Sequence, residues 1–525
     1  MSGMLKRMSP GWLWRILAGA GILLLGAGGV VISTSYDARP TVAVLGGDAP
    51  VSMGAADPSD ITSNNSPTLV RNPLRSDNLA VSNRIDTPRF ACALNVSFDG
   101  GASWTQTPIP LPQGEEPKCF APDLAFAADG TLHLSFVTLK GVGNVPNAVW
   151  TARSQDGGRT LSDPVRVLGP LAFQVRLATD PVNPRRLYLS WLQAAAVGFL
   201  SFPQTGNPIE VVSSEDGGVS WQPPQRASSP GRARVAAPVP GVGPRGELYV
   251  LYVDLGEDRL DYEGGHGGKG GPPYQGHFSL VLARSLDHGR SWQESLVDAG
   301  IVPIHRFVVL FPPFPAMAID HRSGRVYAAF HDGRMGDPDV WIWSLPLGGR
   351  RWEGPTRVND TPKHDRRWQY LPQLAVAPDG RVDVVYYDRR SDPENVMNHV
   401  SLQSSFDHGK SFAPAVRLSS RSFDSRVGFG AKQGLPDLGS RLALLSDDRR
   451  ALAVWTDTRA GTVATNKQDL TRAVVAFSKP ARLAQPLESA LRYGGLALML
   501  LGAGFLTWTL AGPRMRSRAR RLAHG

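Results

Sequence analysis

The sequence predicts an all-β protein, a β-propeller of four-stranded blades, with a transmembrane helix at the C-terminus and a second apolar segment at the N-terminus. Three observations predict it: a repeated octapeptide, strand pairs in step with that repeat, and apolar runs at both ends of the chain. The octapeptide reads Ser-x-Asp-x-Gly-x-Ser/Thr-aromatic and recurs every 57 to 71 residues, which indicates one structural unit copied within the fold. Its copies begin at Ser97, Ser154, Ser214, Ser285, Ser405 and, in degenerate form, Ser344.

The octapeptide has the chemistry of a tight turn between two strands. In the copy SFDGGASW, which opens at Ser97, Asp99 is expected to accept backbone hydrogen bonds and Gly101 to supply a positive φ. Trp104 then returns the chain to an apolar contact. The aspartates of the copies together resemble a cluster of catalytic carboxylates, but this turn chemistry predicts that they are structural. The matching residues of the other copies are Asp156, Asp216, Trp221, Asp287, Trp292 and Asp407.

The strands follow the same period. Seven alternating apolar runs, rich in β-branched and aromatic residues, each follow a shorter run that often closes on an Asp-Gly type of turn. Four-stranded units at this spacing favour radial blades over a sandwich or a solenoid. We count seven blades between about residues 66 and 477, and six is the alternative if the weak first or last unit is no blade. The seventh lacks an outer strand, which residues 41–52 are expected to supply.

The octapeptide resembles the Asp-box, or BNR, repeat of the sialidase-like propellers, over roughly residues 60 to 480. For a sialidase the resemblance implies an arginine triad for the substrate carboxylate, a Tyr nucleophile activated by a Glu, and an Asp acid/base. The resemblance also implies that one of these arginines stands in a Phe/Tyr-Arg-Ile-Pro tetrapeptide ahead of the first Asp box. This chain departs from that pattern, because no such tetrapeptide precedes Ser97. The nearest stretches surround Arg71 and Arg89, and no Glu stands in an obvious position to activate a tyrosine.

The two ends of the chain are interpreted as membrane segments. Residues 16–32 form an uninterrupted apolar run after basic residues, and residues 493–512 form an uncharged one followed by five arginines. By the positive-inside rule the arginines stay in the cytoplasm, which puts the propeller on the extracytoplasmic side of the cell membrane. The predicted parts are 1–33, a membrane anchor or a cleaved signal peptide; 34–65, a linker with a ring-closing strand; 66–480, the propeller; 481–492, a linker; 493–512, the transmembrane helix; and 513–525, a basic tail.

The distribution of charge limits which partners the protein is expected to bind, and the cysteine content predicts a disulfide. The formal net charge is +10, but residues 1–33 and 486–525 carry eight of these charges, so nucleic acid is excluded as a partner and a lipid bilayer is expected. Cys92 and Cys119 are the two cysteines of the chain and are predicted to form a disulfide, with two buried thiols as the alternative. No cofactor is expected. A structural Ca²⁺ site at the GDPD run from Gly336 is considered, and a solvated turn is favoured.

Candidate ligand-binding residues lie on the face opposite the octapeptides. Three blades end their second strand with Asp-x-Arg, and a ring of such guanidinium groups would suit an acidic sugar, unless each Asp merely orients its own Arg. Arg366, Arg367 and Tyr370 precede the sixth blade and are expected at the central opening, with Tyr370 as the candidate catalytic residue. The arginines of the Asp-x-Arg pairs are Arg334, Arg390 and Arg459.

Three functions are compatible with these patterns. The first is a non-catalytic propeller that binds a glycan or a surface protein, the second an exo-α-sialidase-like glycoside hydrolase acting on terminal acidic sugars, and the third a structural surface protein. The hydrolase predicts three arginines around a carboxylate-sized volume, with a tyrosine hydroxyl and a Glu within hydrogen-bond distance of each other. The binding propeller predicts an open, aromatic-lined or polar rim without that pair.

Overall fold

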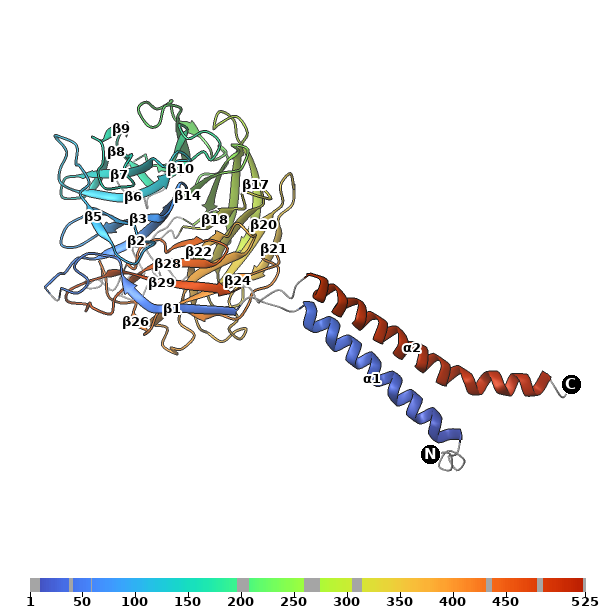
Figure 1. Cartoon of the computed structure of the whole chain (residues 1–525). Helices are drawn as coiled ribbons and strands as arrows, with labels where there is room; N and C mark the ends of the chain where they lie inside the picture. Colours follow the sequence, from blue (N-terminus) through green and yellow to red (C-terminus); the bar gives the residue numbers. More distant parts are fainter. Residues whose placement is uncertain are drawn as a thin grey trace. The chain divides into compact units, whose positions relative to one another are not determined.

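The structure is a computed structural model that describes residues 10–36, 41–57, 59–195, 207–258, 274–304, 314–430, 437–478 and 485–522. It consists of two compact units, Val44–Ala476 and the two terminal segments Met1–Ala43 and Phe477–Gly525 (Figure 1). Much of the Gly-rich insertion between Asp254 and Phe278 lies outside the described residues.

The larger unit is a β-propeller of seven antiparallel sheets, as the repeat count predicts. Blade 1 contains β2 (Asn64–Asn72), β3 (Arg75–Ile85), β4 (Ala91–Ser97) and β5 (Thr105–Thr107). Blade 2 contains β6 (Cys119–Phe126), β7 (Leu132–Lys140), β8 (Val145–Ser154) and β9 (Val165–Leu168). Blade 3 contains β10 (Ala172–Thr179), β11 (Leu187–Gln193), β12 (Ile209–Ser214) and β13 (Gln225–Arg226). Blade 4 contains β14 (Val235–Val242), β15 (Leu248–Asp254), β16 (Phe278–Ser285) and β17 (Gln293–Ile301).

The remaining blades close the ring. Blade 5 contains β18 (Ala316–Ile319), β19 (Val326–Asp332), β20 (Asp339–Leu345) and β21 (Glu353–Arg357). Blade 6 contains β22 (Gln369–Val376), β23 (Val382–Asp388), β24 (Met397–Ser405) and β25 (Val416–Arg417), and β26 (Phe423–Asp424) adds a short fifth strand to β24. Blade 7 contains β27 (Ala443–Ser446), β28 (Arg450–Asp457) and β29 (Asp469–Ser478). Each innermost strand contacts the innermost strand of the next blade, and β27 contacts β2.

The outer strand of blade 7 comes from the other end of the chain. β1 (Thr41–Pro50) pairs with β29, so the sheet order is β1-β29-β28-β27. Just after β1, the N–H of Val51 donates to the carbonyl of Leu470 at 2.7 Å, and the Val51 side chain is buried with Leu79 and Leu452. The ring is therefore held shut by a sheet that contains residues from both ends of the propeller.

The apolar runs are buried on both faces because each sheet lies between two others. Apolar clusters fill the spaces between consecutive blades, for example Leu251 of blade 4 with Phe330 of blade 5. Trp191, Trp343 and Trp455 are among the largest fully buried side chains. This double burial explains why the middle strands read as nearly continuous apolar stretches in the sequence.

The Asp boxes form the turn between the third and fourth strands of blades 1, 2, 3, 4 and 6. The Ser97 hydroxyl donates to Asp99 at 2.7 Å, the Gly101 N–H donates to Ser97 Oγ at 2.9 Å, and the Ser103 N–H donates to Asp99 at 2.9 Å. Hydrogen bonds from Ser103 lower the pKa of Asp99 to about 2. The same bonds recur at Asp156, Asp216, Asp287 and Asp407. Trp104, Trp221 and Trp292 pack against the apolar clusters between blades.

The smaller unit contains two helices, α1 (Pro10–Tyr36) and α2 (Gln485–Leu522), which run antiparallel to each other (Figure 1). By length and composition, Ser489–Thr509 of α2 is suited to cross a membrane, whereas the apolar part of α1, Ile16–Val31, is shorter. α2 begins at Gln485, so residues 485–492 of the expected linker belong to this helix.

Candidate functional site

A pocket of about 410 Å³ lies at the innermost strands of blades 1, 2 and 3 and the segment before β27. Its walls come from the starts of these strands, from the β3–β4 and β7–β8 loops and from the segments that join blades. These connections lie on the face opposite the Asp boxes, where the sequence places candidate binding residues. The lining includes Ser66, Arg84, Phe90, Phe120, Phe173, Gln174, Phe314, Phe429, Ser440 and Arg441.

Bulges in the innermost strands shape this wall. In five blades the register of the innermost strand slips at one residue with positive φ. Such a bulge bends the strand and re-aims its side chains. In the first three blades the bulged residue lines the pocket, and the Ser66 hydroxyl also accepts the Ser440 N–H at 2.9 Å. The five bulged residues are Ser66, Ala121, Gln174, Ala237 and Leu371.

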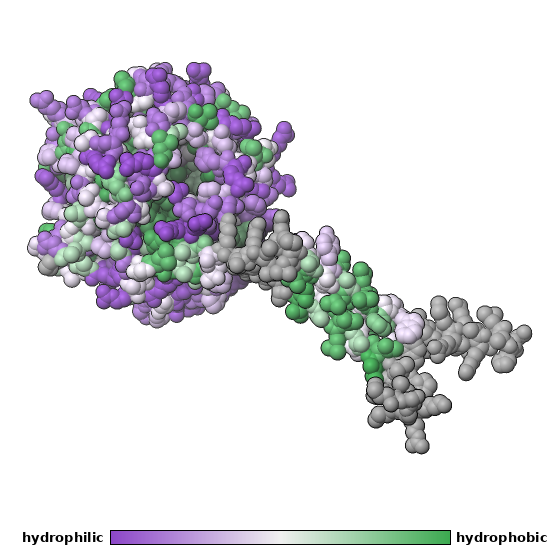
Figure 2. Space-filling view, in the orientation of Figure 1, coloured by the Kyte–Doolittle hydropathy of each residue, from purple (hydrophilic) through white to green (hydrophobic). Residues whose placement is uncertain are grey.

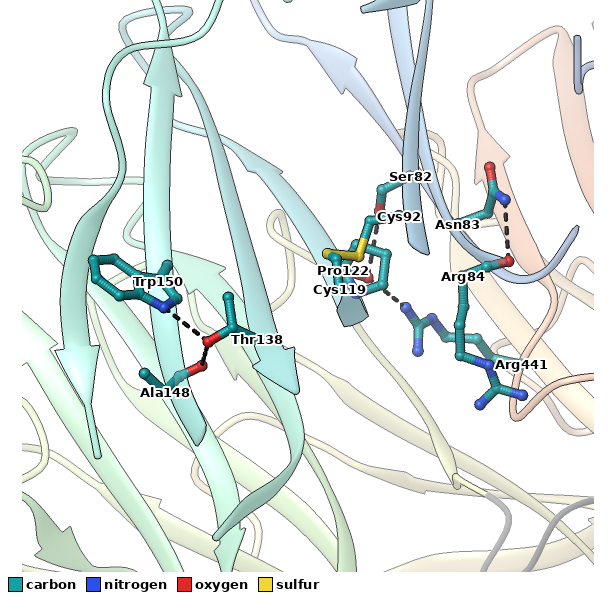
Figure 3. The surroundings of a disulfide bond; sticks show 10 residues. All are labelled: Ser82, Asn83, Arg84, Cys92, Cys119, Pro122, Thr138, Ala148, Trp150 and Arg441. Carbon is teal, nitrogen blue, oxygen red and sulfur yellow. Dashed lines mark hydrogen bonds between the residues drawn. A yellow bond between two sulfur atoms is a disulfide. The ribbon is translucent and has the colours of Figure 1, made fainter. Parts of the chain in front are cut away.

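Three arginines from three blades meet beside the pocket. Arg84 and Arg441 line it, and Figure 3 shows their side chains next to each other near the Cys92–Cys119 disulfide. Arg176 of β10 is close enough to Arg441 for its charge to act on that guanidinium group. No local pattern in the sequence links these residues, since they belong to blades 1, 3 and 7.

Two of the three guanidinium groups have carboxylate partners. Arg84 is bound by Asp86 at 2.8 Å and by Asp437, and all three side chains are buried. Burial and the neighbouring Asp437 raise the pKa of Asp86, because Arg84 alone cannot compensate two buried carboxylates. Arg176 Nε donates to Asp123 at 2.8 Å.

Arg441 has no carboxylate of its own. It is 7% exposed and donates to Thr68 Oγ1 at 3.1 Å and to the carbonyl of Pro122 at 2.9 Å, both neutral acceptors. The Asp123 carboxylate lies 3.9 Å away and is already bound to Arg176. Burial, followed by repulsion from Arg176 and Arg84, lowers the pKa of Arg441 to about 9, so it remains cationic at neutral pH. A buried cation without a full counter-charge favours an anion in this pocket.

Aromatic side chains make the rest of the wall. Phe90 packs edge-on against Phe120 at 5.5 Å between ring centroids and against Phe429 at 5.4 Å. Arg84 lies over the Phe120 ring, and Arg176 lies over the Phe314 ring. The pocket therefore combines a cationic floor with apolar ring faces, which suits a ligand that carries both an anionic group and a ring.

The disulfide holds one side of this wall. Cys92 near the start of β4 and Cys119 at the start of β6 are bonded to each other, with 5.4 Å between their Cα atoms. Phe90 and Phe120 are close neighbours of these cysteines in the sequence, and both line the pocket. The bond thereby joins blade 1 to blade 2 beside Arg84 (Figure 3).

The Asp-x-Arg arginines lie elsewhere on this face and do not line the pocket. Each bonds the Asp two residues before it and a second carboxylate from another element. These second partners are Asp298 for Arg334 at 2.9 Å, Asp360 for Arg390 at 2.8 Å and Asp48 for Arg459 at 2.8 Å. With two carboxylates on each guanidinium group, these arginines tie parts of the propeller together, which matches the structural alternative for them.

Residues 364–372, which contain Arg366, Arg367 and Tyr370, do not line the pocket either. Tyr370 is fully buried, its hydroxyl donates to Asn398 at 2.9 Å, and it accepts from Arg389 at 2.8 Å. Burial raises its pKa, so the phenol stays protonated. Arg366 is exposed, and its carbonyl accepts from Asn395 at 2.8 Å, while Arg367 is half-buried. The structure thus does not bring these three residues together with Arg84, Arg176 and Arg441.

The GDPD run contributes a carboxyl pair. Asp337 is buried and hydrogen-bonded to Asp365, and burial together with repulsion from Asp339 and Asp365 raises the pKa of Asp337 to about 6. A nearby negative charge disfavours the ionised form of a buried carboxyl group. Within the described ranges, no group of three His, Cys, Asp or Glu side chains is arranged to hold a metal ion.

This pair predicts a pH dependence of stability. Because the folded-state pKa of Asp337 lies above its unfolded value, the proton it binds stabilises the fold below about pH 4, and this contribution is lost as pH rises through about 6. We expect Asp337→Asn to raise the melting temperature at pH 8 and to raise it less at pH 4.5. Thermal melting across this range measures the effect. The exposed Asp163→Asn is the control, and equal pH dependence of Asp337→Asn and the wild type would contradict the prediction.

Sequence reasoning missed the pocket arginines, although one local signal was present. A proline follows four of the five bulged residues, at Pro67, Pro122, Pro238 and Pro372. Proline cannot donate a hydrogen bond to a neighbouring strand, so a proline near the start of an innermost strand indicates irregular pairing there. In the first three blades this irregular part of the strand lines the pocket. Arg71, which the sequence offered as a nearest match to the sialidase motif, instead bonds Asp447 at 3.1 Å at the other end of blade 1.

Comparison with known proteins finds solved structures of low sequence identity. No protein-family model and no curated protein matches the chain. Similar solved structures include a protein of unknown function from Dyadobacter fermentans, with 13% identity and a TM-score of 0.45 over 83% of this chain and 99% of that chain. A Hadza microbial sialidase has 13% identity and a TM-score of 0.42 over 79% and 76%. A Penicillium chrysogenum α-L-arabinanase has 15% identity and a TM-score of 0.39 over 69% and 95%.

Proposed function

We propose that this seven-bladed Asp-box propeller, sialidase-like in fold, is a membrane-anchored extracytoplasmic receptor that binds acidic glycans in its central pocket. The single observation that carries the proposal is Arg441, a nine-tenths-buried cation in the pocket wall with neutral hydrogen-bond partners. A carboxylate would give this guanidinium group the counter-charge that the protein does not, through a charge-assisted hydrogen bond. The hydrogen bonds of Arg441 to described residues come from its Nε and Nη2 atoms.

The aromatic lining supports a sugar as the carrier of that carboxylate. Sugar rings present C–H faces that pack on Phe rings, and Phe90, Phe120 and Phe429 already form one connected wall. Gln174 adds an uncharged amide group at its bulge, where a hydroxyl group of a glycan would find a partner. An acidic sugar therefore matches both the charge and the surface of the pocket better than a neutral sugar or an apolar molecule.

Location outside the cytoplasm is supported by three features. Disulfides persist in oxidising compartments, and the two cysteines of the chain form a disulfide with each other. Ser489–Thr509 of α2 is long and apolar enough to cross a bilayer. The arginines that follow it in the sequence are of the kind that remain in the cytoplasm.

Binding is favoured over hydrolysis by the composition of the pocket. Its described lining contains no Tyr, Asp or Glu, so it offers neither a tyrosine–glutamate pair nor a second carboxylic acid for glycosidic bond cleavage. The convergence of Arg84, Arg176 and Arg441 is the one feature that an exo-α-sialidase-like hydrolase would share. We therefore expect the full chain in detergent micelles to bind α-methyl sialoside without releasing the fluorophore from a fluorogenic sialoside.

The decisive variant is Arg441→Met. Methionine retains an unbranched aliphatic chain in place of the arginine stem and removes the charged guanidinium group. Loss of a charge-assisted hydrogen bond is worth about 1.5–3 kcal/mol, so we expect the affinity for methyl sialoside and methyl glucuronide to fall by roughly 10- to 150-fold. Calorimetric titration measures it, and methyl galactoside should bind neither protein.

The matched control is Arg166→Gln, which changes an exposed arginine of β9 and should bind as the wild type does. Equal affinity of wild type and Arg441→Met for the acidic sugars would remove the pocket from the proposal. Turnover of the fluorogenic sialoside that Arg441→Met abolishes would replace the receptor by the hydrolase.

A further inference from the structure

Helices α1 and α2 contact each other along a seam of glycines. In α1 the buried positions of the described part include Gly21 and Gly28, and in α2 they include Gly495 and Gly502, so the buried glycines recur every seventh residue on both helices. A seven-residue spacing keeps one stripe of each helix facing its partner over several turns. The two helices therefore meet through matched stripes.

The backbones approach closely at two levels of this seam. A Cβ atom added to Gly21 would lie 2.9 Å from the carbonyl oxygen of Gly502, and one added to Gly28 would lie 2.6 Å from that of Gly495. Leu25 and Met499 fill the space around these crossings, since a Cβ on Gly502 would be 2.9 Å from Leu25 Cγ and one on Gly28 would be 2.6 Å from Met499 Cγ. Any larger side chain at these glycines would force the helices apart.

The outward faces of the pair are apolar instead. Leu23 of α1 is 75% exposed and Leu500 of α2 is 66% exposed, and the described part of the helices is largely hydrophobic on the face that Figure 2 shows. Two helices whose seam is glycine and whose outside is leucine have the arrangement of membrane helices, because lipid gives no hydrophobic drive and close backbone contact holds the pair together. In water the large apolar side chains would occupy the seam.

From these contacts we propose that α1 is retained in the mature protein as a second membrane-spanning helix, bound to α2 through the Gly21/Gly502 and Gly28/Gly495 crossings. The inference rests on the membrane location proposed above. A signal peptide that is removed after export has no use for a seam matched to a helix at the other end of the chain. With both helices across the bilayer, the two chain ends lie on the cytoplasmic side, and Lys6, Arg7 and Arg15 join the C-terminal arginines there.

Intact mass and disulfide crosslinking of the full chain in its native membranes test this inference. The purified protein should have the mass of a chain that still contains α1. Leu25→Cys with Met499→Cys should crosslink under mild oxidation, because both side chains lie in the seam. Leu23→Cys with Leu500→Cys is the matched outward pair and should not crosslink.

A seam variant separates packing from mere proximity. Adding Gly28→Leu to the Leu25→Cys/Met499→Cys chain should lower the crosslinked fraction about tenfold, because the new side chain meets the Gly495 carbonyl and Met499. Gly26→Leu is the control, since a Cβ at Gly26 meets nothing within 4 Å, and it should leave the yield unchanged.

The outcomes distinguish this inference from the membrane proposal. A mature protein that sediments with membranes but lacks residues 1–33 would overturn the retained helix and leave the anchoring by α2 intact. Equal crosslinking with Gly28→Leu and Gly26→Leu would overturn the glycine seam. A protein that does not sediment with membranes at all would overturn both proposals.

Discussion

A propeller that begins at residue 53, without β1, is expected to unfold at a much lower temperature than one that begins at residue 41. Without β1 the strand β29 becomes a free edge, and its outward N–H and C=O groups lose their partners. Val51 and its bond to Leu470 are lost as well. With backbone bonds worth about 1 kcal/mol each, we expect a loss on the order of 5 kcal/mol.

Thermal unfolding and size-exclusion chromatography of chains 41–478 and 53–478 measure this difference, and the shorter chain should also associate through its exposed edge. Leu45→Ser in the longer chain is the control, because Leu45 is 41% exposed and the substitution leaves the backbone ladder in place. Equal melting temperatures for the two lengths would mean that three strands are enough to close the seventh blade.

Removal of the disulfide is expected to have the second largest effect. Cys92 and Cys119 are separated by 27 residues. Closing a loop of that length lowers the conformational entropy of the unfolded chain, which adds about 3.5 kcal/mol to the free energy of unfolding. The variant with Cys92→Ser and Cys119→Ser should therefore have a urea midpoint lower by the corresponding amount. The same change should weaken the binding of acidic sugars, because Phe90 and Phe120 are held next to these cysteines.

Reductant provides the internal control for this prediction. A reducing agent should bring the wild type to the stability of the double serine variant and leave that variant unchanged. Equal urea midpoints for wild type and variant under oxidising conditions would show that the bond adds nothing to the stability of the folded chain.

The fold was predictable because its signals are local. Each Asp box contains its own turn chemistry, as the bonds of Asp99 illustrate, and each blade repeats the same apolar strand pair, so seven copies identify a propeller without any long-range information. The degenerate copy at Ser344 still occupies the turn after β20, with Gly348 at a positive φ. Copy number and spacing therefore identify the architecture even where one copy lacks its aspartate.

The site was not predictable because it depends on how blades meet. Arg84, Arg176 and Arg441 have no motif in common, and only ring closure brings the first and seventh blades together. Tyr370 illustrates the opposite case. The segment before β22 was expected to face the opening, but the bulge at Leu371 adds one residue between the pairs Tyr370–Tyr387 and Gln373–Val385. One extra residue reverses the alternation of a strand, and Tyr370 lies inside the protein.

The Asp-x-Arg arginines have a consequence for how the propeller yields to heat or force. Arg334 of blade 5 bonds Asp298 of blade 4, Arg390 of blade 6 bonds Asp360 in the segment after blade 5, and Arg459 of blade 7 bonds Asp48 of β1. A linear repeat array peels from its free ends, one module after another. Here two of the ion pairs join neighbouring blades, the third holds blade 7 to the strand that completes it, and the contact of β27 with β2 closes the ring, so no blade is terminal. Loosening one blade therefore removes contacts from both of its neighbours, and we expect the propeller to melt as a single calorimetric unit.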